Sequence, residues 1–283
     1  MLTAKYKIRI PPGCLAEFQA DTGNNPESKH RILYNLSILA KMQTTIKIIN
    51  LSLPFKLGSV NCYLIKTHTG YVLIDTGCSN ARDRLVEELE RAGCRPGDLK
   101  LVLLTHGDFD HAGNAAFLRK KYKAVIAIHH EDSGMVEHGD IFYSRKKHNV
   151  AAGFLARFLF RFSKSVRFKA DLFVDEGSDL TEYGLSAKVL HLPGHSRGSI
   201  GIIANGEEFF CGDLLVNGKR PRLNTVIDDP ETADNSVRKI VSMGPETVYP
   251  GHGKPFSMNA LSIHPPAKMK RSQPLISQYP TPR

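Results

Sequence analysis

The sequence predicts an α/β fold, and three observations lead to that prediction. Short apolar runs of strand length recur along the chain, as in TIKIINLSL (45–53) and KLVLLTHGD (100–108). The segment 79–92 instead repeats its apolar residues at helical spacing. Several of the apolar runs also end in loops that carry histidine or aspartate. Strands and helices therefore alternate, and chemically versatile side chains gather where strands end.

The first elements follow one another from residue 45. Three successive β-branched and apolar runs, 45–53, 60–67 and 70–77, predict strands. The next segment, SNARDRLVEELERA, predicts a helix with Ser79 or Asn80 as its N-cap and Gly93 as its stop.

The next strand and helix enclose a loop. Residues 101–104 are continuously apolar, as expected of a strand buried on both faces. The segment 112–122 (AGNAAFLRKKY) predicts a helix, so residues 105–111 form a strand-to-helix loop. Further along, 187–195 predicts a strand, 199–213 a hairpin that turns at Asn205-Gly206, and 246–253 a short strand.

The loop at 105–114, THGDFDHAGN, holds a cluster of side chains that could bind metal. His106, Asp108, Asp110 and His111 lie within six positions. Three more such residues, His195, Asp213 and His252, each follow a predicted strand. Imidazole and carboxylate groups that converge from strand ends are a typical ligand set for divalent metals.

Composition narrows the function classes. With 283 residues and 41% hydrophobic residues, the chain can bury a sizeable core. It contains no apolar run long enough to cross a membrane and no secretory signal pattern at the N-terminus, so we expect a cytoplasmic protein. Five dispersed cysteines suit a reducing compartment, and we expect Cys62, Cys78 and Cys211 to be buried.

The net charge of +10 is concentrated at the ends of the chain. Residues 1–41 contribute +3 and residues 264–283 contribute +4, which leaves only +3 for residues 42–263. We expect 42–263 to be the folded domain, 264–283 to be a disordered tail, and 1–41 to be a loosely held or disordered extension, or a misassigned start. Nucleic acid is therefore not the expected partner, and the sequence does not set the oligomeric state.

Residues 45–257 resemble the metallo-β-lactamase-fold hydrolases. The matching marks, in order, are Asp75 in LIDTG, the 106–111 loop, His195 in PGHSRGS, Asp213 in CGD and His252 in YPGHG. The resemblance implies a four-layer αβ/βα sandwich, in which two mixed β-sheets are flanked by helices.

The resemblance also implies roles for these residues. One metal ion would be held by His106, Asp108 and His195, the other by Asp110, His111 and His252, and Asp213 would bridge the two. Asp75 would orient a ligand from behind, although an aspartate before Thr-Gly could instead cap a turn. The expected reaction is hydrolysis by a water that the two ions share and activate, with Asp110 as the catalytic group that orients it and takes its proton.

Asp108 departs from the commonest family pattern, in which the second ligand is histidine. An additional negative charge should lower the Lewis acidity of the adjacent metal, and so weaken hydrolysis unless something compensates. An oxygen donor also shifts the metal preference from zinc, which we expect here, toward iron or manganese.

Several functions fit this reading. We expect cleavage of an ester, thioester or lactone in a small-molecule substrate, with a phosphodiester, and hence a nuclease, as an alternative. The di-iron flavoprotein branch of the superfamily, which has a carboxylate at this ligand position, suggests a redox enzyme that needs an electron-donating partner. A binding module without catalysis is the least expected alternative, because it would have little use for seven metal ligands.

One segment outside the metal cluster stands out. Residues 143–170 carry eight Lys or Arg and no acid, and the apolar residues repeat at helical spacing. This basic amphipathic helix could pack on the core, form a wall of the active site in which Arg157 and Arg161 bind substrate anions, or contact a membrane surface or phosphate backbone.

Overall fold

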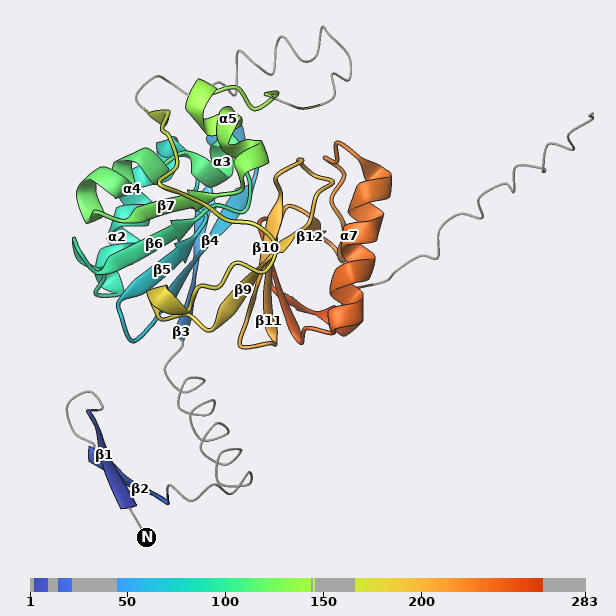
Figure 1. Cartoon of the computed structure of the whole chain (residues 1–283). Coiled ribbons are helices and arrows are strands. Elements are labelled where there is room, and N and C mark those ends of the chain that lie inside the picture. Colours follow the sequence, from blue (N-terminus) through green and yellow to red (C-terminus); the bar gives the residue numbers. More distant parts are fainter. Residues whose placement is uncertain (1–2, 10–14, 22–44, 144, 146–165, 262–283) are drawn as a thin grey trace, which may run out of the picture.

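The computed structural model describes residues 3–9, 15–21, 45–143, 145 and 166–261. Its centre is a pair of β-sheets that face one another (Figure 1). The first sheet has the strand order β3-β4-β5-β6-β7-β8, and the second has the order β15-β14-β11-β10-β9. Both sheets are mixed. The sequence therefore predicted the α/β class correctly.

The six-stranded sheet starts with an antiparallel meander and continues as a parallel sheet. Strands β3, β4 and β5 are antiparallel neighbours, whereas β5 through β8 run parallel to one another. The strand bounds are β3 Thr45–Ser52, β4 Ser59–Lys66, β5 Tyr71–Ile74, β6 Leu99–Leu103, β7 Val125–Ile128 and β8 Leu172–Phe173. The parallel part places the ends of β5 and β6 side by side.

The second sheet is built around one hairpin. Strands β10 and β11 turn at Asn205 and Gly206, whose φ angles are +52° and +75°, as the predicted Asn-Gly turn requires. The bounds in this sheet are β9 Ala187–His191, β10 Ile200–Ala204, β11 Glu208–Gly212, β14 Thr247–Pro250 and β15 Phe256–Ser257. A small hairpin, β12 Leu215–Asn217 with β13 Pro221–Leu223, leaves the sheet after β11.

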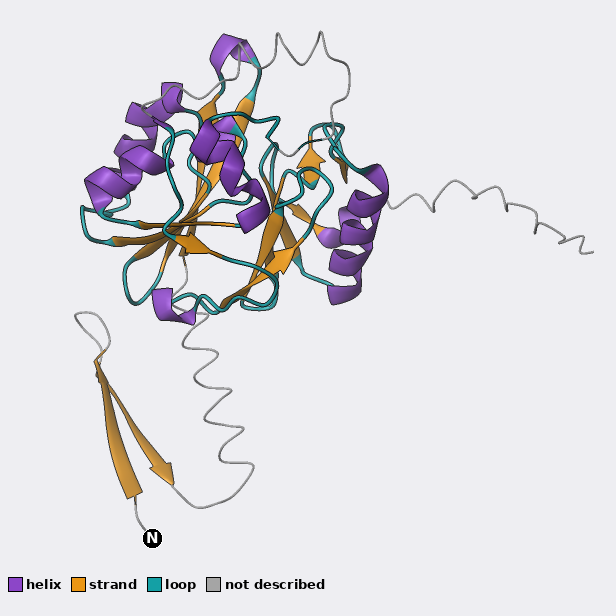
Figure 2. Ribbon diagram, turned by 45° about the horizontal axis from the view of Figure 1, so that its top comes forward, coloured by secondary structure: helices purple, strands orange, loops and turns teal. Residues whose placement is uncertain are grey.

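Helices cover the outer faces of both sheets, which gives the four layers that the family resemblance implied (Figures 1 and 2). On the first sheet they are α2 Arg82–Arg91, α4 Ala115–Tyr122 and α5 His130–His138, and on the second α7 Pro230–Met243. Leu85 and Leu89, one turn apart on α2, are fully buried against the first sheet. Val237 and Ile240 of α7 are buried against the second.

The two sheets are held together by a third core between their inner faces. The strands alternate, so in β4 the side chains of Cys62 and Leu64 face the helices while Tyr63 and Ile65 face the other sheet. Phe210 of β11 packs edge-on against Tyr63, with ring centroids 5.1 Å apart. The predicted burial of Cys62, Cys78 and Cys211 is confirmed.

Two local predictions differ from the structure. Ser79 and Asn80 form a short 3-10 turn, Ser79–Ala81, so α2 begins at Arg82 without a side-chain cap. Gly93 does follow the end of the helix with a φ of +81°. The helix predicted over 112–122 begins only at Ala115, as α4, and a short separate helix, α3 Phe109–Ala112, lies mostly in the predicted loop. Asn114 is the N-cap residue of α4, and its side-chain amide donates hydrogen bonds to the carbonyls of Thr76 and Cys78.

The N-terminal extension contains a hairpin that the sequence analysis did not predict. Strands β1 Thr3–Arg9 and β2 Leu15–Asp21 pair antiparallel. The signal was present as alternating basic and apolar residues in KYKIR, followed by a Pro-Pro-Gly turn sequence. The expected tail, 264–283, lies outside the described residues.

Candidate metal centre

The seven predicted ligands come together where strands of both sheets end. His106 and Asp108 follow β6, and Asp110 and His111 lie on the short helix α3. His195, Asp213 and His252 lie in the loops after β9, β11 and β14. Hydrogen bonds join the two sheets at this edge, from Ile200 N to Thr105 O (2.9 Å) and from Asn61 N to Gly251 O (2.8 Å).

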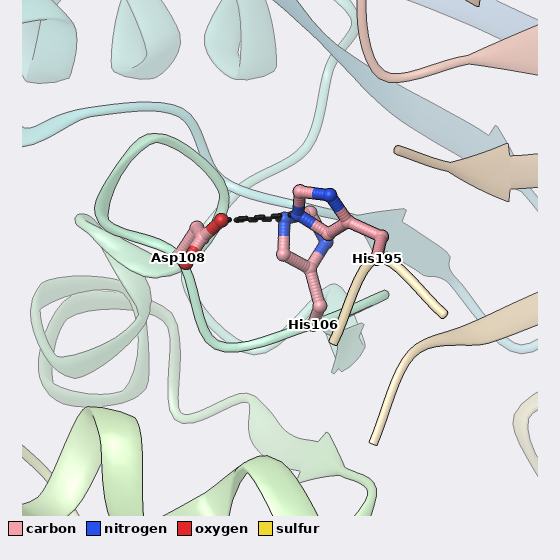
Figure 3. Close-up of side chains that lie close together, drawn as sticks. All are labelled: His106, Asp108 and His195. Carbon is pink, nitrogen blue, oxygen red and sulfur yellow. Dashed lines mark hydrogen bonds and ion pairs between the residues drawn. The ribbon is translucent and has the colours of Figure 1, made fainter. Parts of the chain in front are cut away.

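The first group of ligand atoms is centred on Asp108. Its Oδ2 atom lies 3.1 Å from His195 Nε2 and 3.4 Å from His106 Nε2 (Figure 3). Ligand atoms that share one tetrahedral ion at bond lengths of about 2.0–2.2 Å are separated by roughly 3.3 Å. The spacing therefore fits one divalent ion.

The second group is centred on Asp213. Its two oxygens lie 3.3 Å from His111 Nε2 and 3.3 Å from His252 Nε2. Asp110 Oδ2 lies 3.4 Å from His252 Nε2 and 4.0 Å from His111 Nε2. His106, His111 and Asp213 also form a compact set, so the two groups adjoin. The residues present therefore fit a pair of neighbouring ions.

All four histidines are oriented in the same way. In each ring, Nδ1 faces an oxygen atom outside the cluster and Nε2 faces inward. The Nδ1 contacts are His106 to Thr105 Oγ1 (3.0 Å), His111 to Asp75 Oδ2 (2.8 Å), His195 to Val226 O (2.6 Å) and His252 to Ser59 O (2.7 Å). When these oxygens accept a hydrogen bond from Nδ1–H, each Nε2 lone pair is directed at the place where an ion would bind.

Several polar atoms in the cluster lack a hydrogen bond. Among the described residues, His106 Nε2, His111 Nε2, Asp108 Oδ1 and Asp213 Oδ1 are buried and have no hydrogen-bond partner. Buried polar atoms without partners cost free energy, and they are rare unless a water or an ion satisfies them. Their convergence here supports metal binding.

The charges of the cluster also favour cations. Burial lowers the pKa of His252, but Asp213 and Asp110 outweigh burial and raise it to about 10. Burial raises the pKa of Asp213, yet His252 and His111 hold it well below its usual range. The cluster thus stabilises positive charge beside its carboxylates, whether that charge is a proton or a metal ion.

Asp75 lies behind the ligands, where the sequence analysis expected it. Its two oxygens accept hydrogen bonds from Thr105 N (2.8 Å), Thr105 Oγ1 (2.8 Å) and His111 Nδ1 (2.8 Å). Its φ angle is +58°, a left-handed conformation in which aspartate and asparagine are enriched. Asp75 therefore lies in the turn after β5 and also contacts His111, so the structure has the contacts that both expected roles of this residue require.

Asp132 is a positioning residue that the sequence analysis missed. From α5 its buried carboxylate accepts hydrogen bonds from Gly107 N (3.0 Å), Ser196 Oγ (2.6 Å) and Gly198 N (2.8 Å). It thereby ties the loop of His106 and Asp108 to the loop of His195. No spacing pattern in the sequence indicated this contact.

The segment 224–228 also reaches the cluster. Asn224 Nδ2 donates a hydrogen bond to Asp213 Oδ2 at 3.2 Å. The carbonyl oxygen of Val226 is the hydrogen-bond partner of His195 Nδ1. Asp228 Oδ2 lies 3.0 Å from Arg145 Nε. This segment, which precedes α7, therefore supports both groups of ligands.

Arg145 is the second charged residue that the sequence analysis did not single out. Its Nη2 atom donates to Asp108 Oδ2 at 3.0 Å and lies 3.4 Å from His195 Nε2. Burial lowers the pKa of Arg145, but Asp108 and Asp228 outweigh burial and raise it, so the guanidinium is fully charged. The other arginines that the sequence analysis proposed near the site, Arg157 and Arg161, lie outside the described residues.

A further set of potential ligands lies apart from the centre. His129, Asp175 and His191 come close together, but hydrogen bonds account for their facing atoms. His129 Nδ1 accepts from Glu131 N (3.3 Å), and His129 Nε2 lies 3.2 Å from Asp175 Oδ1. The rings of His129 and His191 are stacked at 10°, so their lone pairs do not converge on one point. These residues are better explained as a structural cluster.

Gly251 lies against two of the candidate ligands, where there is no space for a side chain. A Cβ atom there would meet Asp213 Oδ1 and would lie 2.7 Å from His111 Cε1. We expect Gly251→Ala to weaken metal binding by at least about tenfold, because a displaced ligand changes the geometry that an ion requires. Gly218→Ala is the matched control, since a Cβ there meets nothing within 4 Å. Equal metal affinities for the two variants, measured by competition with a chromophoric chelator, would contradict this expectation.

Comparison with known proteins agrees with this geometry. The family model described as the metallo-beta-lactamase superfamily matches residues 56–252, which include all seven ligands. Hydroxyacylglutathione hydrolase GloC of Haemophilus influenzae is 28% identical over 80% of this chain and 96% of its own length. The probable metallo-hydrolase YflN of Bacillus subtilis is 26% identical over 70% of this chain and 81% of its own.

The fold is similar to that of solved structures. The crystal structure of TTHA1623 in a di-iron-bound form superposes with a TM-score of 0.57 and 28% sequence identity, and the match covers 75% of this chain and 95% of that one.

Among the described residues, no helix is sufficiently long and apolar to cross a membrane.

Proposed function

The chain belongs to the metallo-beta-lactamase superfamily and is a metal-dependent hydrolase, and we propose that it holds two divalent ions and cleaves a thioester, an ester or a lactone. One observation carries the dinuclear proposal. The ligand group around Asp108 and the group around Asp213 adjoin through His106 and His111, whose ring centroids are 4.1 Å apart. Ions in such groups would be near enough to act on one substrate.

The chemistry follows from the donor set. When bound, the ions would lower the pKa of a water molecule and polarise the carbonyl group under attack. His106, Asp108 and His195 would hold one ion, His111, His252 and Asp110 the other, and Asp213 would contact both. The outward hydrogen bonds of the four histidines would place the proton of each ring on Nδ1, which leaves Nε2 available to bind an ion.

Asp110 is proposed as the group that moves the proton. Its carboxylate lies at the start of α3, where its Oδ2 atom is 3.4 Å from His252 Nε2 and is only slightly exposed. From this position it can accept a proton from the attacking water and pass it to the leaving group.

The substrate class is supported by a relative. GloC is named for the hydrolysis of hydroxyacylglutathione, a thioester, and it matches most of this chain. Neither GloC nor YflN is named for the cleavage of a phosphodiester. Zinc is the proposed metal because the ligand set is rich in imidazole. Iron remains the alternative, since Asp108 supplies a harder donor and TTHA1623 was solved with two irons.

A substrate panel tests the proposal. Full-length protein loaded with zinc, iron or manganese is assayed with an S-acylglutathione, an aryl ester, a lactone and a phosphodiester, and a chelator-treated sample is the control. We expect metal-dependent cleavage of at least one carbonyl substrate. Cleavage of the phosphodiester alone would favour the nuclease alternative. A protein with full metal content that cleaves none of the four would contradict the proposal, and reduction of oxygen or nitric oxide by the iron form would favour the redox enzyme.

A further inference from the structure

Asp108 contacts a cationic side chain from a distant part of the chain. Arg145, 37 positions away, donates from Nη2 to Asp108 Oδ2 at 3.0 Å. The guanidinium side chain is only 8% exposed, so water does not screen this pair strongly. Its Nε atom lies 3.0 Å from Asp228 Oδ2.

The contact is made to the same oxygen that faces the imidazoles. Asp108 Oδ2 lies 3.1 Å from His195 Nε2 and 3.4 Å from His106 Nε2, the spacing of ligands that share an ion. Arg145 Nη2 also lies 3.4 Å from His195 Nε2, so it reaches the inward-facing atoms of two ligands. An imidazole nitrogen has one lone pair, so Nη2 must move away from His195 when an ion binds there. A carboxylate oxygen has two lone pairs, so Asp108 Oδ2 can bind the ion with one while the other still accepts the Arg145 N–H. The arginine therefore draws electron density from the oxygen that would bind the metal.

This arrangement compensates for the unusual ligand. An aspartate in place of histidine adds a negative charge beside the first ion and would reduce its Lewis acidity. Arg145 adds a positive charge at hydrogen-bond distance from that aspartate. The charges of Asp108 and Arg145 sum to zero, and a neutral imidazole at this position would also have a charge of zero.

We propose that Arg145 is a positioning residue of the first metal group, where it neutralises Asp108 so that this carboxylate binds a divalent ion as histidine would. The inference rests on the proposed function only in requiring that the cluster bind metal. Asp228 forms an ion pair with Arg145 through Nε at 3.0 Å, so a second carboxylate contributes to holding the guanidinium at this place. The aspartate and the arginine then form a pair in which neither member is replaceable alone.

A double-mutant cycle on the full-length protein tests the pair. Zinc stoichiometry is measured by elemental analysis, and affinity by competition with a chromophoric chelator, for wild type, Asp108→His, Arg145→Met and the double variant. We expect Asp108→His to weaken binding of the first ion by about 10- to 100-fold, because a buried guanidinium then faces the ion without the carboxylate. The double variant should recover to within about threefold of wild type, as expected if the two residues are coupled.

Two controls accompany the cycle. Arg222→Met removes one exposed arginine from β13 and should leave zinc affinity unchanged. Thermal unfolding of each variant checks that it folds. If Arg145→Met does not fold, Arg145→Gln replaces it in the cycle.

Three results would overturn the inference. The first is full zinc binding by Asp108→His alone. The second is a double variant as weak as Asp108→His. The third is one ion in wild type and two in Arg145→Met, which would mean that the guanidinium takes the place of the first ion. The cycle measures metal binding and the substrate panel measures hydrolysis, so the two tests are independent. A panel without hydrolysis would not contradict a coupling measured between Asp108 and Arg145. A cycle without coupling would not contradict the proposed hydrolase function.

Discussion

Replacing Asp110 with asparagine is expected to lower kcat/KM by about 10²- to 10⁴-fold, the range typical of a lost general base. The amide keeps an oxygen that can face His252, but it cannot accept a proton from the attacking water. It also removes one of the negative charges beside His252 Nε2, at 3.4 Å. The measurement is steady-state hydrolysis of the best substrate from the panel, with metal content determined on the same samples.

The same substitution on the surface is the matched control. Asp234 lies on the exposed face of α7, and Asp234→Asn should leave kcat/KM within about twofold of wild type, because surface substitutions have small effects. If Asp110→Asn kept both metals and more than a tenth of the wild-type activity, Asp110 would not be the group that moves the proton.

Asp75→Ala is expected to damage both stability and metal binding. Three donors, Thr105 N, Thr105 Oγ1 and His111 Nδ1, would lose their acceptor inside the protein. Each unsatisfied buried donor costs about 1–3 kcal/mol, and alanine at a φ of +58° adds roughly 1–2 kcal/mol. We therefore expect the free energy of unfolding to fall by at least about 4 kcal/mol, and zinc affinity to fall about 10- to 100-fold because His111 is no longer oriented.

Asp75→Asn separates the two effects. Asparagine tolerates the left-handed conformation and keeps one oxygen for the Thr105 amide, but its nitrogen cannot accept from His111. We expect this variant to remain folded with weakened zinc binding. Denaturant unfolding of the metal-free proteins and chelator competition provide the two readouts, and unchanged zinc affinity in both variants would exclude an orienting role for Asp75.

The candidate ligands could be found from the sequence because most of them stand in loops that follow strands. His106, His195 and His252 stand directly after apolar runs, and the ends of neighbouring strands meet at one edge of a sheet. The Asn205-Gly206 turn was predictable for a similar reason, since two adjacent residues with positive φ strongly favour that dipeptide. In both cases the residues that predict the feature are neighbours in the sequence.

The residues that support the ligands carry no such signal. Asp132 is joined to Ser196 across 64 positions, and Arg145 to Asp108 across 37. An aspartate in a helix or an arginine in a basic stretch is usually a solvated surface residue, so nothing local distinguishes these two. Only the packing of α5 and of the segment after it against the 105–111 loop brings them to the site.

The same limit applies to the unusual ligand. The sequence identified Asp108 as an anionic donor that would lower the Lewis acidity of its metal and weaken hydrolysis unless another group compensated. It did not identify that group, because Arg145 stood among many basic residues of 143–170. The structure shows that one of them is nearly buried and directed at Asp108, so the anomaly and its compensation become one feature of the site.

Metal content per chain is the most direct measurement of the central claim. Elemental analysis is made on full-length protein purified without added metal or chelator, and again after incubation with zinc and removal of the excess. The arrangement of His106, Asp108 and His195 beside Asp110, His111, Asp213 and His252 predicts two divalent ions per chain. One ion or none after zinc loading would contradict the dinuclear centre.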